Sequence, residues 1–168
     1  NLHMLGVLNL HKPCGPTSRD CVASIESRTE PFKVGHAGTL DPMASGVLLL
    51  LIGPAVRLTD DFHLLDKEYL GTFELGLTSL SADTETDLQT IENAPRIAEH
   101  EFSKACEAFV GTISQTPPVF SAVRIGGRRA HNLARSGKRV VMPSREVNVA
   151  SMEVLKFDYP IVSLRIVC

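Results

Sequence analysis

The sequence contains no tryptophan, two tyrosines and four cysteines among its 168 residues. The cysteines, at positions 14, 21, 106 and 168, form no C-x-x-C pair. A zinc knuckle or a redox dithiol is therefore unsupported, and we expect reduced thiols and no metal site. The longest aliphatic run, residues 47–52, is far shorter than the ~20 apolar residues of a membrane-spanning helix. The N-terminus also lacks the charged and apolar regions of a secretory signal. These absences predict a cytoplasmic protein with no membrane partner.

Charge is distributed unevenly along a chain whose net charge is only −2. Residues 60–101 carry eleven acidic and two basic side chains. Residues 110–145 carry no acid and seven bases: Arg124, Arg128, Arg129, Arg135, Lys138, Arg139 and Arg145. Clustered bases attract anions, so this segment predicts an anion-binding surface, with a merely solvated basic face as the alternative.

The length suits about one domain, and 43% hydrophobic residues can fill a core. Apolar periodicity and turn residues predict an α+β fold with a mixed, mostly antiparallel sheet flanked by helices and loops. Strands are expected at residues 5–10, 47–52, 69–77, 119–125, 138–142, 147–155 and 161–167, and helices at 18–28, 54–65, 102–110 and 128–136. Residues 30–41 and 78–100 are expected to be loops. Asp41-Pro42 is expected to start a single helical turn, and residues 126–127 to form a turn.

The densest cluster of special residues is the loop 35–42, which combines two glycines, a histidine and one carboxylate. Loops on a rigid scaffold often carry catalytic groups. On spacing alone, a helix cap is favoured for Asp41 and an ordinary hydrogen-bonding role for His36. The sequence has no Walker A pattern, no G-x-S-x-G and no histidine pair at i, i+4. Phosphate-loop, serine-hydrolase and zincin chemistry therefore lack support.

Residues 35–48, GHAGTLDPMASGVL, resemble the G-H-x-G-[TA]-L-D-P-x-A-[TS]-G-[VM]-L signature of TruB-type pseudouridine synthases, which modify a uridine in the T-arm of tRNA. Three further motifs follow in the family's order. Residues 6–18 are similar to its K-P-x-G-x-[ST]-S motif and residues 67–69 to its K-x-Y strand. Residues 118–137 are similar to its P-x-[YF]-S-A-[LV]-[KR] segment and the helix after it. The resemblance covers residues 6–168 and implies the pseudouridine synthase fold.

The resemblance also implies roles for individual residues. Asp41 matches the catalytic aspartate, a nucleophile on the uridine at either C6 of the base or C1′ of the ribose, and both routes stay open. Tyr69 matches the active-site tyrosine that packs on the flipped-out base. His36 matches a histidine that contacts the RNA near that nucleotide. Lys12 and Pro13 match a structural motif under the active site, where packing or a salt bridge is expected.

The acid-free segment 110–145 corresponds to the family's RNA-gripping insertion. Six of its bases are expected to neutralise phosphates: Arg124, Arg128, Arg129, Arg135, Lys138 and Arg139. The implied partner is the T-arm of tRNA, the implied chemistry uses no cofactor, and we expect a monomer.

Two departures from the family are visible. Residues 78–87 match its T-D-T-x-D-A-x-G loop only loosely, so no role is assigned to them. In the family, the strand that matches residues 161–167 continues into a segment with a second tyrosine and an arginine that pairs with the catalytic aspartate. We therefore expect residues 4–168 to be a catalytic domain incomplete at its C-terminus and inactive alone, with the C-terminal RNA-binding domain absent. Residues 161–167 are expected to form an unprotected sheet edge.

Two other classes of function stay open. A non-catalytic tRNA-binding or RNA-folding module would remodel tRNA without forming pseudouridine. A small-molecule enzyme with an aspartate nucleophile would show no competition by RNA for its site, although the uneven charge argues against it.

Overall fold

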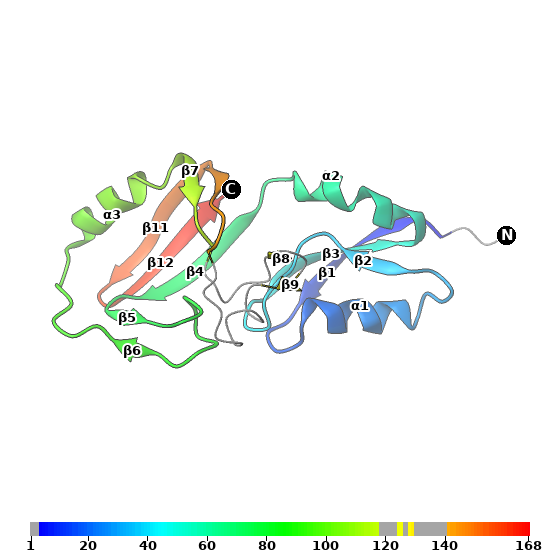
Figure 1. Cartoon of the computed structure of the whole chain (residues 1–168), viewed down its shortest axis with the longest axis horizontal. Coiled ribbons are helices and arrows are strands. Elements are labelled where there is room, and N and C mark those ends of the chain that lie inside the picture. The colour runs from blue at the N-terminus through cyan, green and yellow to red at the C-terminus, as the bar shows by residue number, and fades with distance from the viewer. Residues whose placement is uncertain (1–3, 118–123, 126–127, 130–140) are drawn as a thin grey trace. The chain divides into compact units, whose positions relative to one another are not determined.

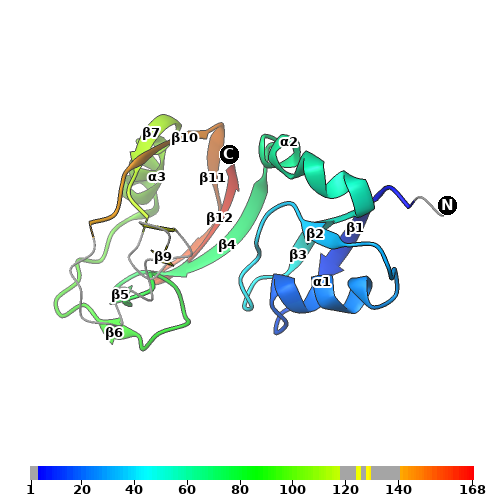
Figure 2. The ribbon, with the colours of Figure 1, turned by 45° about the vertical axis from the view of Figure 1, so that its right-hand side comes forward.

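The computed structural model describes residues 4–117, 124–125, 128–129 and 141–168. The chain divides into two compact units, Asn1–Leu65 and Asp66–Cys168, and the catalytic domain expected over residues 4–168 stays a prediction. Each unit combines helices and strands (Figures 1 and 2).

The first unit is built on a three-stranded antiparallel sheet in the order β1-β3-β2. Its strands are β1 (Gly6–Lys12), β2 (Val34–His36) and β3 (Gly46–Ile52). Helix α1 (Ser18–Glu26) lies along one side of this sheet (Figure 1). A 3-10 helix, η1 (Gly53–Leu58), leads into α2 (Thr59–His63). The core forms where Val22 of α1 packs with Leu48 and Leu50 of β3, all three fully buried.

A capping box fixes the start of α1. The Thr17 hydroxyl accepts a hydrogen bond of 3.1 Å from the Asp20 backbone N–H, and the Asp20 carboxylate accepts one of 2.8 Å from the Thr17 N–H. The Thr17 hydroxyl also donates to this carboxylate at 2.7 Å, and these bonds hold the pKa of Asp20 below its usual value. The cap fixes the residue at which the β1–α1 loop ends.

The second unit contains a three-stranded antiparallel sheet in the order β11-β12-β4. These strands are β4 (Glu68–Glu74), β11 (Ser151–Asp158) and β12 (Ile161–Val167). Helix α3 (Glu99–Glu107) packs on β11, and its Cys106 joins Val162 and Leu164 in the core (Figure 1). Burial raises the pKa of the Cys106 thiol.

Three two-stranded ribbons complete the described part of the second unit. They pair β7 (Gly111–Gln115) with β10 (Arg145–Val149), β5 (Leu77–Thr78) with β6 (Gln89–Thr90), and β8 (Arg124–Ile125) with β9 (Arg128–Arg129). All strand pairs of the described residues are antiparallel. The predicted α+β class is confirmed.

Most predicted elements are present, but several assignments were wrong. Residues 34–36 form β2, not loop, because Val34 is buried and the segment pairs with β3. The predicted loop 78–100 begins within β5 and contains β6. Residues 147–155 were predicted as one strand, but the chain changes partners at Ala150, with β10 on β7 and β11 on β12.

Three further predictions, all in the C-terminal half of the chain, were wrong. Arg128 and Arg129 are extended instead of helical, because they pair with Ile125 and Arg124. Residues 141–142 lie outside any strand. Strand β12 was expected to be a sheet edge, yet it is the central strand between β11 and β4. Residues 119–123, 126–127, 130–136 and 138–140 of the predicted elements lie outside the described residues.

None of the described helices combines the length and the hydropathy that a membrane crossing needs.

Candidate active site

The glycine-rich loop 37–45 and the loop between β1 and α1 lie against each other. The backbone N–H of Gly15 donates to the carbonyl oxygen of Pro42 at 2.8 Å. The Cys14 thiol donates to the carbonyl oxygen of Met43 at 3.2 Å. Both bonds are made within two residues of Asp41, so the β1–α1 loop supports the backbone around this carboxylate.

Asp41 begins a tight turn, closed by the bond of 3.0 Å from the Ala44 N–H to the Asp41 carbonyl oxygen. No helical turn follows, so the predicted helix start and the helix-cap interpretation of Asp41 are wrong. The cause is local. Gly46, with a φ of 144°, takes the chain directly into β3 in a conformation that other residues rarely adopt.

The Asp41 carboxylate is exposed, and within the described part of the first unit no group donates a hydrogen bond to it. Its backbone is thus held while its side chain is available. This combination suits a group that must meet a reacting atom.

Lys12, at the end of β1, is fully buried. Its ammonium donates to the carbonyl oxygens of Pro13 and Pro16, each at 2.9 Å, and to that of Pro42 at 3.4 Å. A buried ammonium must have its donors satisfied, and here backbone carbonyls satisfy all three. In the described residues Lys12 makes no salt bridge, so of the two expected roles the geometry favours packing and hydrogen bonding. Pro13 is exposed and contributes its carbonyl to this set.

His36 ends β2 and is half-buried. Its Nδ1 lies 2.6 Å from the carbonyl oxygen of Gly38. Because a carbonyl can only accept, Nδ1 carries the proton, and in the neutral ring Nε2 is then an acceptor. The bond fixes the imidazole against the loop that carries Asp41.

Tyr69 lies on β4, directly opposite Ile166 of the central strand. Residues opposite each other share a face, so Tyr69 lies on the face that packs against α3. It is 45% exposed, as is Phe73 two pleats further along β4. Tyr69 belongs to the second unit and Asp41 to the first.

The predicted RNA-binding bases fall in the least described segment. The backbones of Arg124, Arg128 and Arg129 lie in the β8–β9 ribbon. Arg135, Lys138 and Arg139 lie outside the described residues.

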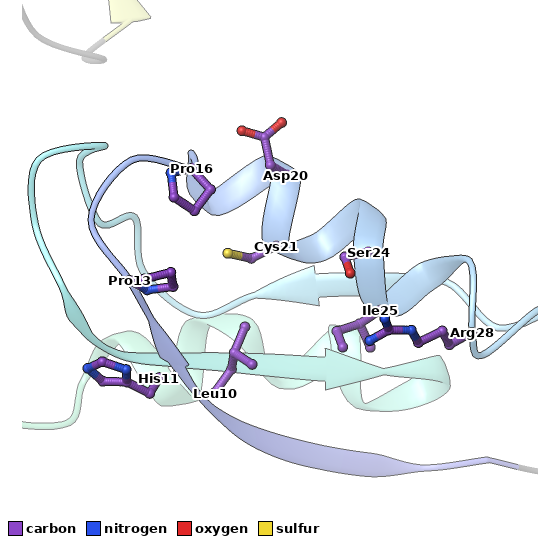
Figure 3. A pocket seen from close by; sticks show the side chains of 9 residues that line it. All are labelled: Leu10, His11, Pro13, Pro16, Asp20, Cys21, Ser24, Ile25 and Arg28. Atoms are coloured by element: carbon purple, nitrogen blue, oxygen red, sulfur yellow. The ribbon is translucent and has the colours of Figure 1, made fainter.

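An open depression of about 310 Å³ lies between the end of β1 and α1 (Figure 3). Its lining includes Leu10, Cys21 and Ile25, with Asp20 and Arg28 among its polar residues. Asp41 does not line it, and no second carboxylate faces Asp20 in it. We assign no chemistry to this depression.

No group of three histidine, cysteine, aspartate or glutamate residues in the described ranges is placed to hold a metal ion. One site residue escaped the sequence analysis. The Ser18 hydroxyl bonds to both backbone groups of Leu40, and the only signal for it was the final serine of the K-P-x-G-x-[ST]-S motif.

The sequence of this chain is similar to those of known proteins. The family model described as TruB family pseudouridylate synthase, N-terminal domain, matches residues 26–168. The tRNA pseudouridine synthase B of Acaryochloris marina is 44% identical over 157 residues, which are 92% of this chain and 53% of that protein. The protein of the same name from Parabacteroides distasonis is 38% identical over 168 residues, covering 96% of this chain and 72% of that protein.

Solved structures also resemble this chain in fold. A chain in the crystal structure of a Cbf5-Nop10-Gar1 complex superposes with a TM-score of 0.67 at 31% identity. The match covers 96% of this chain and 39% of that one. A chain in the structure of an H/ACA RNP bound to a substrate RNA containing 2′-deoxyuridine gives a TM-score of 0.64 at 27% identity. The chain thus spans about half the length of the first of these relatives, 53%.

Proposed function

The chain belongs to the TruB family of pseudouridylate synthases, and from that premise we propose that the protein isomerises uridine to pseudouridine in the T-loop of tRNA. Residues 4–168 would form most of the catalytic domain. The observation that carries the proposal is Asp41: an exposed carboxylate on a turn whose backbone is held by Lys12 and Gly15.

In this reaction Asp41 acts as a nucleophile on a uridine flipped out of the RNA, at C6 of the base or at C1′ of the ribose. The N1–C1′ bond breaks, the uracil turns, and a C5–C1′ bond forms. C5 loses its proton and N1 gains one, so atoms and electrons balance without a redox partner. The chemistry needs a placed carboxylate and shelter from water, and no cofactor enters any step.

Tyr69 would pack on the flipped base. Its half-exposed ring, on an edge strand, offers an aromatic face of the kind that bases stack on. His36 would contact the RNA beside the target nucleotide, since Nε2 remains free to accept a hydrogen bond once Nδ1 is committed to Gly38.

The bases of segment 110–145 would grip the phosphates of the T-arm. This role needs a high density of positive charge with no acids nearby, which is the composition of the segment. Arg124, Arg128, Arg129, Arg135, Lys138 and Arg139 are the proposed contacts.

The test uses the natural polypeptide that carries these residues, incubated with a T-arm stem-loop, followed by nucleoside analysis of the digested RNA. We expect one uridine to be converted to pseudouridine. A stem-loop with cytidine at that position is the matched control and should stay unmodified.

Two outcomes would contradict the proposal. Refolding of tRNA with no pseudouridine formed would favour an RNA-folding module. Absence of any binding to the stem-loop would favour a small-molecule substrate.

A further inference from the structure

The residue before Asp41 is held by a single buried hydroxyl. The Ser18 Oγ donates to the carbonyl oxygen of Leu40 at 2.8 Å and accepts from the Leu40 N–H at 2.9 Å. Ser18 is only 3% exposed, although it is the first residue of α1 and lies 22 positions away in sequence. One side chain thus uses both its donor and its acceptor on the same residue.

These two bonds act on the backbone of Asp41. The carbonyl of Leu40 belongs to the peptide plane that enters Asp41, so fixing it restricts rotation about the N–Cα bond of Asp41. The Leu40 side chain packs against the core cluster of the first unit, which holds the same residue from its other end.

The peptide plane that leaves Asp41 is held independently. Proline follows Asp41, and proline restricts the conformation of the residue before it. The carbonyl of that plane, which is Asp41's own, accepts the bond of 3.0 Å from the Ala44 N–H. The Pro42 carbonyl, one peptide plane further on, accepts bonds from Gly15 and Lys12 at 2.8 and 3.4 Å. The Asp41 carboxylate therefore projects from a backbone fixed on both sides, and among the described residues Ser18 alone supplies side-chain hydrogen bonds to Leu40.

From this geometry we infer that Ser18 is a positioning residue: it acts through Leu40 to aim the Asp41 carboxylate at the flipped uridine. The inference rests on the proposed role of Asp41 as nucleophile. It differs from a role in folding alone, because Thr17 and Asp20 already cap α1 without Ser18. A misplacement of about 1 Å can lower a rate by about 100-fold, so the hydroxyl should matter for chemistry more than for RNA binding.

The test compares Ser18→Ala, Ser18→Thr and Ser24→Ala in the natural polypeptide, at a temperature where thermal unfolding shows each to be folded. Single-turnover pseudouridine formation and the stem-loop Kd are measured separately. Ser24 is the matched control, since it is an exposed serine on the same helix. Hydrogen exchange of the Leu40 and Ala44 amides reports the backbone directly.

We expect Ser18→Ala to slow the chemical step by about 10- to 100-fold, with the Kd within about threefold of the parent. Its Leu40 and Ala44 amides should exchange faster. Ser18→Thr keeps a hydroxyl and should recover most of the rate, and Ser24→Ala should match the parent in every measurement.

A Ser18→Ala variant with the parent rate would overturn the inference. So would a rate loss matched by an equal loss of folded, RNA-binding protein, or a Ser18→Thr variant that folds normally but is as slow as Ser18→Ala. The Asp41→Asn variant distinguishes failure of the positioning role of Ser18 from failure of the proposed nucleophile. If that variant is dead while Ser18→Ala is unaffected, only the positioning role fails, whereas turnover by Asp41→Asn removes the nucleophile and the positioning role together.

Discussion

The backbone N–H of Gly15 and the carbonyl oxygen of Pro42 are 2.8 Å apart and join two loops that are 27 residues apart in sequence. Lys12 and Ser18, at either end of the β1–α1 loop, add bonds to the same short stretch around Asp41. The β1–α1 loop therefore supports the candidate site, and the glycine-rich loop carries Asp41.

Replacing Lys12 by methionine should destabilise the first unit by about 2 to 4 kcal/mol. The methionine keeps the buried volume but leaves the carbonyls of Pro13 and Pro16 without their donor, and hydrogen bonds to charged groups contribute about 1.5 to 3 kcal/mol each. Denaturant unfolding measures the change. Lys33→Met, at an exposed lysine, is the control and should stay within about 0.5 kcal/mol of the parent. Equal stability of the two variants would show that the Lys12 bonds contribute nothing.

A row of charges crosses the sheet of the second unit and should make its stability depend on pH. Arg165 donates two hydrogen bonds to Glu68, at 3.0 and 2.9 Å, and lies 3.6 Å from Glu153. The hydrogen bonds from Arg165 hold the pKa of Glu68 below its usual value.

Because the folded pKa is the lower one, the unfolded chain takes up the proton first as the pH falls. The contribution of Glu68 is therefore complete above about pH 4.5, the usual value, and is lost as the pH falls through the folded pKa. We expect the parent to have a higher urea midpoint than Glu68→Gln at pH 7 and the two midpoints to converge in acid. Glu74→Gln, on the same strand, controls for loss of a carboxylate. A gap between parent and Glu68→Gln that widens in acid would contradict this assignment.

Removing Arg128, Arg129, Lys138 and Arg139 together should weaken RNA binding for every sequence tested. Each lost phosphate contact should reduce the slope of log affinity against log salt by about 0.7 to 0.9. Filter binding or anisotropy over a range of salt concentrations gives the slope. Replacement of Lys33 and Lys104, two bases outside segment 110–145, should leave it unchanged. If the quadruple variant keeps the parent's slope of log affinity against log salt, these bases form a solvated face and do not contact RNA.

Local sequence was sufficient where an element is determined by its own residues. The aliphatic run 47–52 predicted β3, and the apolar spacing within residues 18–28 predicted α1, because burial acts over a few positions of the chain. The edge position expected for residues 161–167 was wrong for the opposite reason. One neighbour of this strand, β11, precedes it in sequence, but the other, β4, is paired with it across about 90 residues, and apolar periodicity does not encode such a pairing.

The residues of the candidate site also differ in how far the sequence predicts them. The family motif pointed to Asp41 and His36, but its spacing alone favoured a helix cap that the structure does not contain. The motif contained Ser18, but the bonds of its hydroxyl to Leu40 could not be predicted, because the two residues lie 22 positions apart in sequence. Short strands such as β2 were missed because three residues carry too little pattern and depend on the strand that they pair with.

The central claim is that Asp41 is the nucleophile, and Asp41→Asn tests it most directly. The amide keeps the size of the side chain and the turn that the backbone closes at Ala44, but it removes the nucleophilic charge. The measurement is single-turnover pseudouridine formation in a T-arm stem-loop, with the Kd for that RNA determined in parallel. We predict no detectable product and a Kd within a few-fold of the parent. Product formation at more than a small fraction of the parent rate would contradict the account.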